Sequence, residues 1–327
     1  MKPALWLLAA ALPLLAQPKL LVNAKVDTRS AAAGLERAFK ALVAAQPQPA
    51  WIGYEAPAVR GSGLGCEYLR DGPATAGVIH LEPPEHAVIL FRVEGNAVGK
   101  LRSLSPNCEI DAGGLPVHWL TGVQPAESIA LLATFVPQRE LDSNGAIAAI
   151  AAHADAAADP VLDRWLAADQ PTWLRRAAAS WIGRERGLHG VEALKNTMAN
   201  DPSEPVRQSA IAALARSQEP EALTLLLATA RSAGNARTRA QAISALDRKP
   251  GQAVLDTIDN AIAHDPDPAV RRRAVDALST LMDDAGIPML IQLVKSSKDA
   301  EVRKQAMNRL QNSGDTRAQA FFEEILK

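Results

Sequence analysis

Aromatic side chains are scarce in this chain. Only 4% of its 327 residues are Phe, Trp or Tyr, although 48% are hydrophobic, and the balance is largely Ala and Leu. Sheet-rich cores favour aromatic and β-branched residues, whereas Ala and Leu suit closely packed helices. The composition therefore predicts that most of the chain is helical.

An excess of either charge is also missing. The chain has 35 Lys and Arg against 36 Asp and Glu, so it lacks the positive field that attracts nucleic acid or anionic lipid. Both are disfavoured as partners. The length suits two parts better than one, or a small domain joined to a repeat array, whose size no single core limits.

No apolar run is long enough to span a bilayer, which takes about 20 residues. The main run, Ala4 to Ala16, follows Met1-Lys2 and precedes Gln17. This order is typical of a secretory signal peptide. We expect residues 1–16 to be a signal peptide cleaved after Ala16, with an uncleaved anchor as the alternative, and the protein to be periplasmic or secreted.

Cysteine is nearly absent, with Cys66 and Cys108 as the two examples. In an oxidising compartment such a pair is normally bonded. We expect a disulfide that closes a loop of about 43 residues and contributes at most about 4 kcal/mol in the chain-entropy model. Two free buried thiols, or a zinc site completed by histidines, are the alternatives.

A 32-residue period, in contrast, runs through the second half of the chain. Arginines recur in one phase, at Arg175, Arg207, Arg239, Arg271 and Arg303. Alanine follows each of them after three residues and an aliphatic residue after seven, and a second apolar series runs through Leu162, Leu194, Leu226, Ile258, Leu290 and Phe322. These spacings, interrupted by Pro and Gly, predict two amphipathic helices per period. Because helices of about ten residues are unstable alone, the pairs must stack on one another.

The segment from Asp265 to Leu278 reads Asp-Pro-Asp-Pro-Ala-Val-Arg and continues as an Ala-rich helix. It resembles a HEAT-type repeat of the short bacterial kind. The Trp, Gly and Tyr marks of tetratricopeptide units and the Thr-Pro-Leu-His of ankyrin units are missing. The resemblance covers residues 140–327 and implies a mainly α fold, a right-handed α-solenoid of about six helix pairs.

In the family that this array resembles, an Asp and an Arg six residues apart form a hydrogen-bonded ladder between successive units. The resemblance implies this role for Asp169 with Arg175, Asp201 with Arg207, and Asp265 with Arg271. Ala233 and Ser297 replace the Asp before Arg239 and Arg303, and Asp299 is a candidate substitute. We interpret these residues as structural.

Residues 20–135 show no repeat and mix helix and strand signals. Helices are expected at 29–45 and from Pro125 through Phe135, and strands at 51–56, 78–81 and 117–120. A hairpin is expected from 87–94 and 97–104, with its turn at Gly95-Asn96. The sequence therefore predicts a small α+β domain with one disulfide ahead of the array, of a family that we do not recognise.

Nothing in this region indicates catalysis. Three histidines lie near carboxylates in sequence, but without a recognised metal-binding spacing: His80, His86 and His118, beside Glu82, Glu85 and Asp111. The Gly-x-Ser-x-Gly motif of α/β-hydrolases is missing as well. We expect no catalytic, cofactor or metal site and no cofactor.

The function that we expect is a non-enzymatic scaffold, which holds a protein or peptide partner on the solenoid surface. One alternative is a ligand-sensing or catalytic amino-terminal domain for which the solenoid is a docking arm. A bilin lyase is disfavoured, because the chain offers no free reactive cysteine and an exported protein is in the wrong compartment for that activity.

Overall fold

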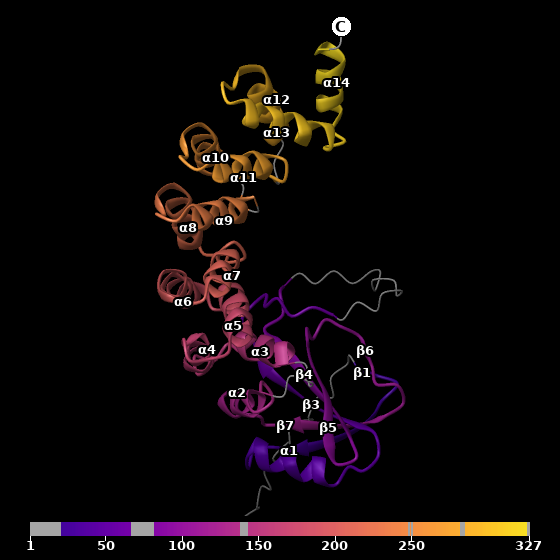
Figure 1. The fold of residues 1–327 in the computed structure, drawn as a ribbon. Coiled ribbons are helices and arrows are strands. Elements are labelled where there is room, and N and C mark those ends of the chain that lie inside the picture. The colour runs from indigo at the N-terminus through magenta and orange to yellow at the C-terminus, as the bar shows by residue number, and fades with distance from the viewer. Residues whose placement is uncertain are drawn as a thin grey trace, which may run out of the picture. The chain divides into compact units, whose positions relative to one another are not determined.

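The computed structural model describes residues 21–66, 82–137, 143–247, 249, 251–281 and 285–325. The chain divides into two compact units, Met1–Ala158 and Asp159–Lys327. Figure 1 shows strands in the first and stacked helices in the second. The predicted signal peptide, the predicted strand at 78–81 and His80 lie outside the described residues.

A five-stranded sheet forms the centre of the amino-terminal unit, with the strand order β2-β7-β3-β4-β5. Its strands are β2 (Lys25–Ser30), β3 (Ala50–Pro57), β4 (His86–Glu94), β5 (Ala97–Leu104) and β7 (Pro116–Thr121). Strand β7 runs parallel to β2 and β3, while β3, β4 and β5 are antiparallel neighbours. Two short strands, β1 (Leu21–Val22) and β6 (Ile110–Asp111), form a separate parallel pair.

The predicted hairpin is confirmed as β4 and β5. Its turn residues Gly95 and Asn96 have φ angles of 60° and 61°. Two-residue hairpin turns of the type that matches strand twist need positive φ at both positions, which Gly adopts without strain and Asn with little. The Gly95-Asn96 pair therefore sets the register of the first two residue pairs, and an irregularity between Arg92 and Val93 shifts it further along the hairpin.

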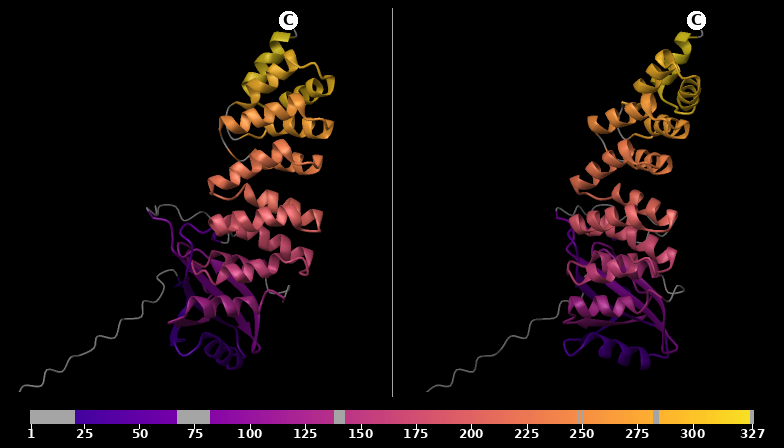
Figure 2. Two further views of the ribbon diagram at one scale, coloured as in Figure 1. Left: turned by 90° about the vertical axis from the view of Figure 1, so that its left-hand side faces the viewer. Right: turned by 60° about the vertical axis from the view of Figure 1, so that its left-hand side comes forward.

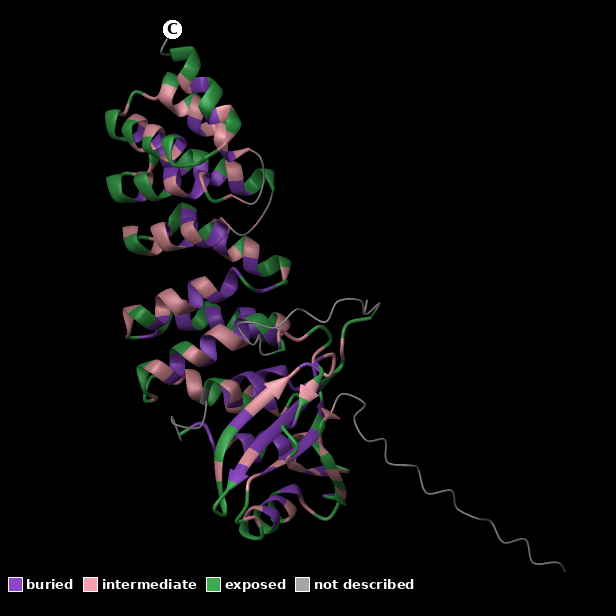
Figure 3. Ribbon diagram, turned by 90° about the vertical axis from the view of Figure 1, so that its right-hand side faces the viewer, coloured by how far each residue is buried: buried purple, intermediate pink, exposed green. Residues whose placement is uncertain are grey.

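Successive residues of β4 point to opposite faces of the sheet, and both faces are covered. On one face Phe91 meets Phe39 of α1 (Leu35–Ala44) at 4.7 Å between ring centroids, and Phe135, after α2 (Pro125–Ala133), at 5.3 Å. On the other face Leu90 belongs to a buried cluster with Trp119. Figure 3 shows this burial as purple on the strands.

The predicted start of the first helix, at residue 29, is wrong. Residues 25–30 form β2, which pairs with β7 some 90 positions away, and α1 begins at Leu35. Gly34, with φ 125°, interrupts the regular backbone conformation between the strand and the helix. The Leu35 N–H donates a hydrogen bond to the Glu127 carboxylate at 3.2 Å. Glu127, a residue of α2, therefore caps the start of α1.

Helix α3 (Ser143–Ala152) packs on the sheet, so the amino-terminal unit extends beyond the boundary predicted between residues 135 and 140. The Val59 N–H donates to the Ala152 carbonyl at 2.7 Å, and Ser103 Oγ donates to the Gly145 carbonyl at 3.2 Å. Residues 146–152 are buried and mostly alanine. Small side chains let this helix lie close against the strands.

The carboxyl-terminal unit is an array of helix pairs, as Figures 1 and 2 show. Its helices are α4 (Ala158–Leu166), α5 (Thr172–Glu185), α6 (Gly187–Asn200), α7 (Glu204–Leu214), α8 (Pro220–Ser232), α9 (Ala236–Leu246), α10 (Gln252–His264), α11 (Pro268–Leu278), α12 (Gly286–Ser296), α13 (Ala300–Gln311) and α14 (Thr316–Ile325). Odd-numbered helices stack on one another in one row, and α6, α8 and α10 stack in a second. The predicted array of stacked helix pairs, which follows a small α+β unit in the sequence, is confirmed.

The in-phase alanines lie at the centre of this stack. All five are fully buried: Ala178, Ala210, Ala242, Ala274 and Ala306. Alanine favours helix and adds little bulk, so consecutive helices of the odd-numbered row approach closely. The 32-residue period therefore reports a repeated packing position.

Candidate interaction surface

Four of the in-phase arginines share one local contact. Arg207, Arg239, Arg271 and Arg303 each donate from Nη1 to the backbone carbonyl six residues earlier, at distances of 2.6 to 2.8 Å. The link across six residues therefore runs to a carbonyl oxygen and not to an Asp side chain. It fixes the guanidinium against the loop that precedes its own helix.

The carboxylate partner comes from the following helix pair. Arg239 binds Asp265 through Nε and Nη2 at 2.7 and 2.8 Å. Arg175 Nη1 lies 3.2 Å from Asp201 Oδ2, and Arg271 Nε lies 3.2 Å from Asp299 Oδ2. The hydrogen bonds implied between Arg207 and Asp201 and between Arg271 and Asp265 are therefore present, but through the Asp carbonyl oxygens. The carboxylates of these two Asp residues face the arginines of the preceding helix pairs, Arg175 and Arg239.

Asp169 does not take part in this ladder. Arg164 binds its two carboxylate oxygens at 2.6 and 2.8 Å, and both side chains are more than half exposed. Arg175 donates instead to the Ala168 carbonyl at 3.1 Å. Asp299 replaces the missing Asp at position 297, but its carboxylate meets Arg271 and not Arg303, for which it was the candidate substitute.

Within the described residues, Arg207 receives no carboxylate from the following helix pair. Ala233 stands where Asp265 and Asp201 stand in other pairs, and Arg207 binds Glu204 of its own helix through Nη2. Other contacts connect the helix pairs on either side. Arg231 donates to Thr257 Oγ1, and Lys249 donates to the Ser217 carbonyl at 2.6 Å.

The Arg239–Asp265 pair is held as a charged pair. Burial of Asp265 opposes its ionisation, but hydrogen bonds from Arg239 and from the Asp267 N–H outweigh burial, so the pKa of Asp265 lies below its ordinary value. The hydrogen bond to Asp265 raises the pKa of Arg239. This rung therefore joins neighbouring helix pairs and leaves neither group available to a ligand.

A groove of about 440 Å³ lies on the other row, between α4 and α6. Its lining combines acidic and amide side chains with small apolar ones and includes neither Lys nor Arg; it consists of Asp163, Leu166, Ala167, Ala168, His189, Glu192, Ala193, Asn196, Thr197, Asn200 and Asp201. His189 Nε2 lies 3.0 Å from Asp163 Oδ1. Leu188, at the start of α6, is 55% exposed beside His189.

Asn196 and Asn200 leave one donor and one acceptor unused in this groove. Asn200 Nδ2 donates to Asn196 Oδ1 at 2.6 Å. Within the described residues, Asn196 Nδ2 and Asn200 Oδ1 have no further partner. The unused N–H of one side chain and the unused oxygen of the other are complementary to the carbonyl and N–H of a peptide backbone.

An equivalent groove occurs two periods later, between α8 and α10, with a volume of about 260 Å³. Asn260 corresponds to Asn196, and His264 corresponds to Asn200. Arg231 stands at the position of Ala167 and reaches across to Thr257. The arginine narrows this second groove, whereas Ala167 leaves the first one open.

His86 and His118, the two of these histidines that the structure describes, do not lie together in a site. His86 is exposed at the start of β4. His118 lies between Asp27 and Gln46. Its Nδ1 is 3.3 Å from Asp27 Oδ2, and its Nε2 is 3.0 Å from Gln46 Oε1. In the described part of the chain, no three His, Cys, Asp or Glu side chains are grouped closely enough to hold a metal ion.

A buried polar cluster in this unit was not predicted. Ser128 Oγ lies 2.9 Å from both Tyr54 Oη and His153 Nε2, and His153 Nδ1 lies 2.6 Å from the Ala149 carbonyl. All three side chains are 0% exposed, and burial raises the pKa of Tyr54. The Ser128–His153 contact resembles a nucleophile and its base, but a site with no exposed surface cannot admit a substrate.

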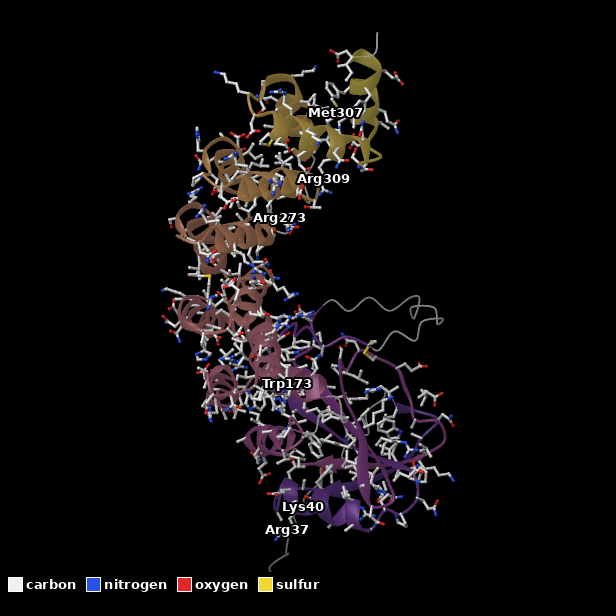
Figure 4. The ribbon with its side chains drawn as sticks, in the orientation of Figure 1. Arg37, Lys40, Trp173, Arg273, Met307 and Arg309 are labelled. Carbon is white, nitrogen blue, oxygen red and sulfur yellow. A yellow bond between two sulfur atoms is a disulfide. The ribbon has the colours of Figure 1, made fainter. Side chains whose placement is uncertain are left out.

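The two cysteines form a disulfide, Cys66–Cys108, which Figure 4 shows as a yellow bond. It connects the segment after β3 to the segment between β5 and β6. Cys108 is buried. The bond therefore stabilises a part of the amino-terminal unit that contains little regular structure.

Comparison with known proteins identifies the array. The family model of HEAT repeats matches residues 158–247 and 255–327. A solved structure of human deoxyhypusine hydroxylase in complex with glycerol is 14% identical, with 61% of this chain and 90% of that chain covered and a TM-score of 0.29, which is too low to support an argument. No curated protein matches the chain. Among the described residues, no helix is long and apolar enough to cross a membrane.

Proposed function

We propose that this chain, which is a HEAT-repeat protein, is a non-enzymatic scaffold that holds an extended segment of a partner protein. The groove between α4 and α6 is the proposed binding site. The observation that supports this most is the unused donor and acceptor pair of Asn196 and Asn200. A repeat array offers a long surface for such binding, because neighbouring pairs extend it without a new core.

The charges of the groove favour a basic side chain in the partner. Asp163 and Glu192 are exposed in the lining, where Lys and Arg do not occur. An Arg or Lys beside the bound backbone segment would pair with one of them.

We also propose that the chain is exported and works in the periplasm or outside the cell. The signal-like residues 1–16 and the disulfide support this, because disulfides persist in oxidising compartments. Intact-mass analysis should find a mature chain that begins near Gln17. Recovery of a soluble cytoplasmic protein that retains Met1 would contradict the proposal.

The binding proposal is tested by affinity capture from the native envelope fraction with two matched variants. The Asn196→Ala/Asn200→Ala double variant removes the peptide-binding amides, and Asn260→Ala changes the corresponding residue of the narrow groove. We expect the partner to be lost with the double variant and retained with Asn260→Ala. Equal recovery of every captured protein by all three chains would contradict the proposed site.

A further inference from the structure

We propose that Arg303, on α13, is an open carboxylate-binding site, at which a partner protein docks an Asp from the loop before one of its helices. This site lies on a different element from the groove between α4 and α6 and does not depend on the function proposed there. Other arginines of the same phase show the bound form of such a site within the chain itself.

Arg239 shows what an occupied site looks like. Its Nη1 donates to the Ala233 carbonyl at 2.8 Å, which leaves Nε and Nη2 directed at the two oxygens of Asp265. Arg303 has the same anchor, because its Nη1 donates to the Ser297 carbonyl at 2.7 Å. Its Nε and Nη2 have no partner among the residues that the structure describes.

The surroundings of Arg303 suit an anion. It lines a groove of about 630 Å³ together with Lys304, and the lining contains no Asp or Glu. Val294 and Met307 supply the apolar part, and Figure 4 shows Met307 on α13. A guanidinium that is fixed by one hydrogen bond loses less freedom when it binds a carboxylate through two more.

The bound forms also indicate the kind of carboxylate. Asp265 and Asp201 both precede a helix, and each accepts a hydrogen bond from the N–H two residues later, at 2.9 and 2.7 Å. Asp299 is the residue before α13 and accepts N–H groups of its first turn. We therefore infer that the occupant is an Asp in such a loop, with the following helix lying over Val294 and Met307.

The full-length chain, labelled with ¹⁵N, tests this by NMR of the arginine Nε–Hε groups. The probe is a peptide with blocked termini that has the sequence of residues 265–278, and the Arg303→Gln variant assigns the resonance. We expect a saturable shift of the Arg303 resonance. A second peptide with Asn in place of Asp265 should bind at least about tenfold more weakly, because a charge-assisted pair is lost.

Arg272→Gln is the control, since Arg272 is exposed on α11 and neither lines this groove nor occupies a ladder position; this variant should bind the peptide within about threefold of wild type. Absence of a shift up to low-millimolar peptide, or equal binding of the Asn peptide, would overturn the site. Concentration-dependent self-association of the chain that Arg303→Gln abolishes would overturn the choice of a different protein as the occupant.

Discussion

Arg239 and Asp265 lie 26 residues apart in the chain, yet two guanidinium nitrogens of Arg239 meet both carboxylate oxygens of Asp265. Their side chains are 10% and 5% exposed. The contact joins the α9–α10 pair to the α11–α12 pair. A buried ion pair contributes little net stability by itself, but loss of one partner leaves the other charge buried and unpaired.

Arg239→Gln should therefore destabilise the array by about 3 kcal/mol. Because neighbouring pairs support each other in a linear stack, the loss should extend to the pairs beyond α10. Urea denaturation followed by circular dichroism measures it. Arg272→Gln is the matched control, since Arg272 is exposed and should change stability by no more than about 0.5 kcal/mol. Equal losses for the two variants would show that the arginine phase is not a structural ladder.

Ala233→Asp should complete the ladder. Ala233 has φ −62° and ψ 130°, nearly the same as Asp265 at −64° and 130°. A carboxylate at this position would therefore face Arg207 as Asp265 faces Arg239, and should add about 1 kcal/mol of stability. The gain must disappear when Arg207 is replaced by Gln, and a gain that persists would contradict the assigned pairing.

Acid should weaken the Arg239–Asp265 rung. The pKa of Asp265 is lower in the folded chain than its ordinary value of about 3.9, so its contribution is complete above about pH 5 and is lost as the pH falls through its native pKa. Wild type should therefore lose more stability than Asp265→Asn between about pH 6 and pH 3. Parallel pH profiles for the two chains would exclude this role.

Reduction of the Cys66–Cys108 bond should destabilise the amino-terminal unit. The bond connects residues 42 positions apart, and the chain-entropy model gives at most about 4 kcal/mol for a loop of that size. Alkylation without reductant should label neither cysteine. The Cys66→Ala/Cys108→Ala chain should melt earlier in its sheet signal and keep the helical signal of the array. Quantitative labelling of the native thiols would contradict the bond.

The array was predictable because each phase of the repeat has one environment. Ala178 and its four equivalents occupy one packing position, so a single period in the sequence reports the whole stack. The pairing within the ladder was not predictable in the same way. Asp265 lies six residues before Arg271 and 26 after Arg239, and the sequence does not distinguish a carbonyl contact from a carboxylate contact.

The amino-terminal unit shows where the local pattern is insufficient. The sequence pattern predicts a helix from residue 29. Residues 25–30 nevertheless form a strand, because β7 pairs with them across a long sequence separation. Tertiary pairing of this kind overrides local preference. Tyr54, Ser128 and His153 come from three separate segments of the chain, so no short sequence motif predicts that they form a cluster.

The groove between α4 and α6 depends on small differences between equivalent positions. Ala167 leaves it open where Arg231 narrows the corresponding groove, and Asn200 replaces His264. A period in the sequence identifies the residues that recur in each repeat, whereas this groove depends on residues that differ between repeats. The repeats therefore predict a scaffold, whereas the groove that we propose as its binding site is not visible in the periodic pattern.

The most direct test of this account is site-specific photocrosslinking in the full-length chain. A photoreactive amino acid at position 168 lies in the open groove, and the same residue at position 232 lies at the equivalent point of the narrow one. We predict a defined crosslinked polypeptide from position 168, which is lost when Asn200→Ala is added, and little or none from position 232. The same products with equal yield from both positions would contradict the claim that the groove between α4 and α6 holds the partner.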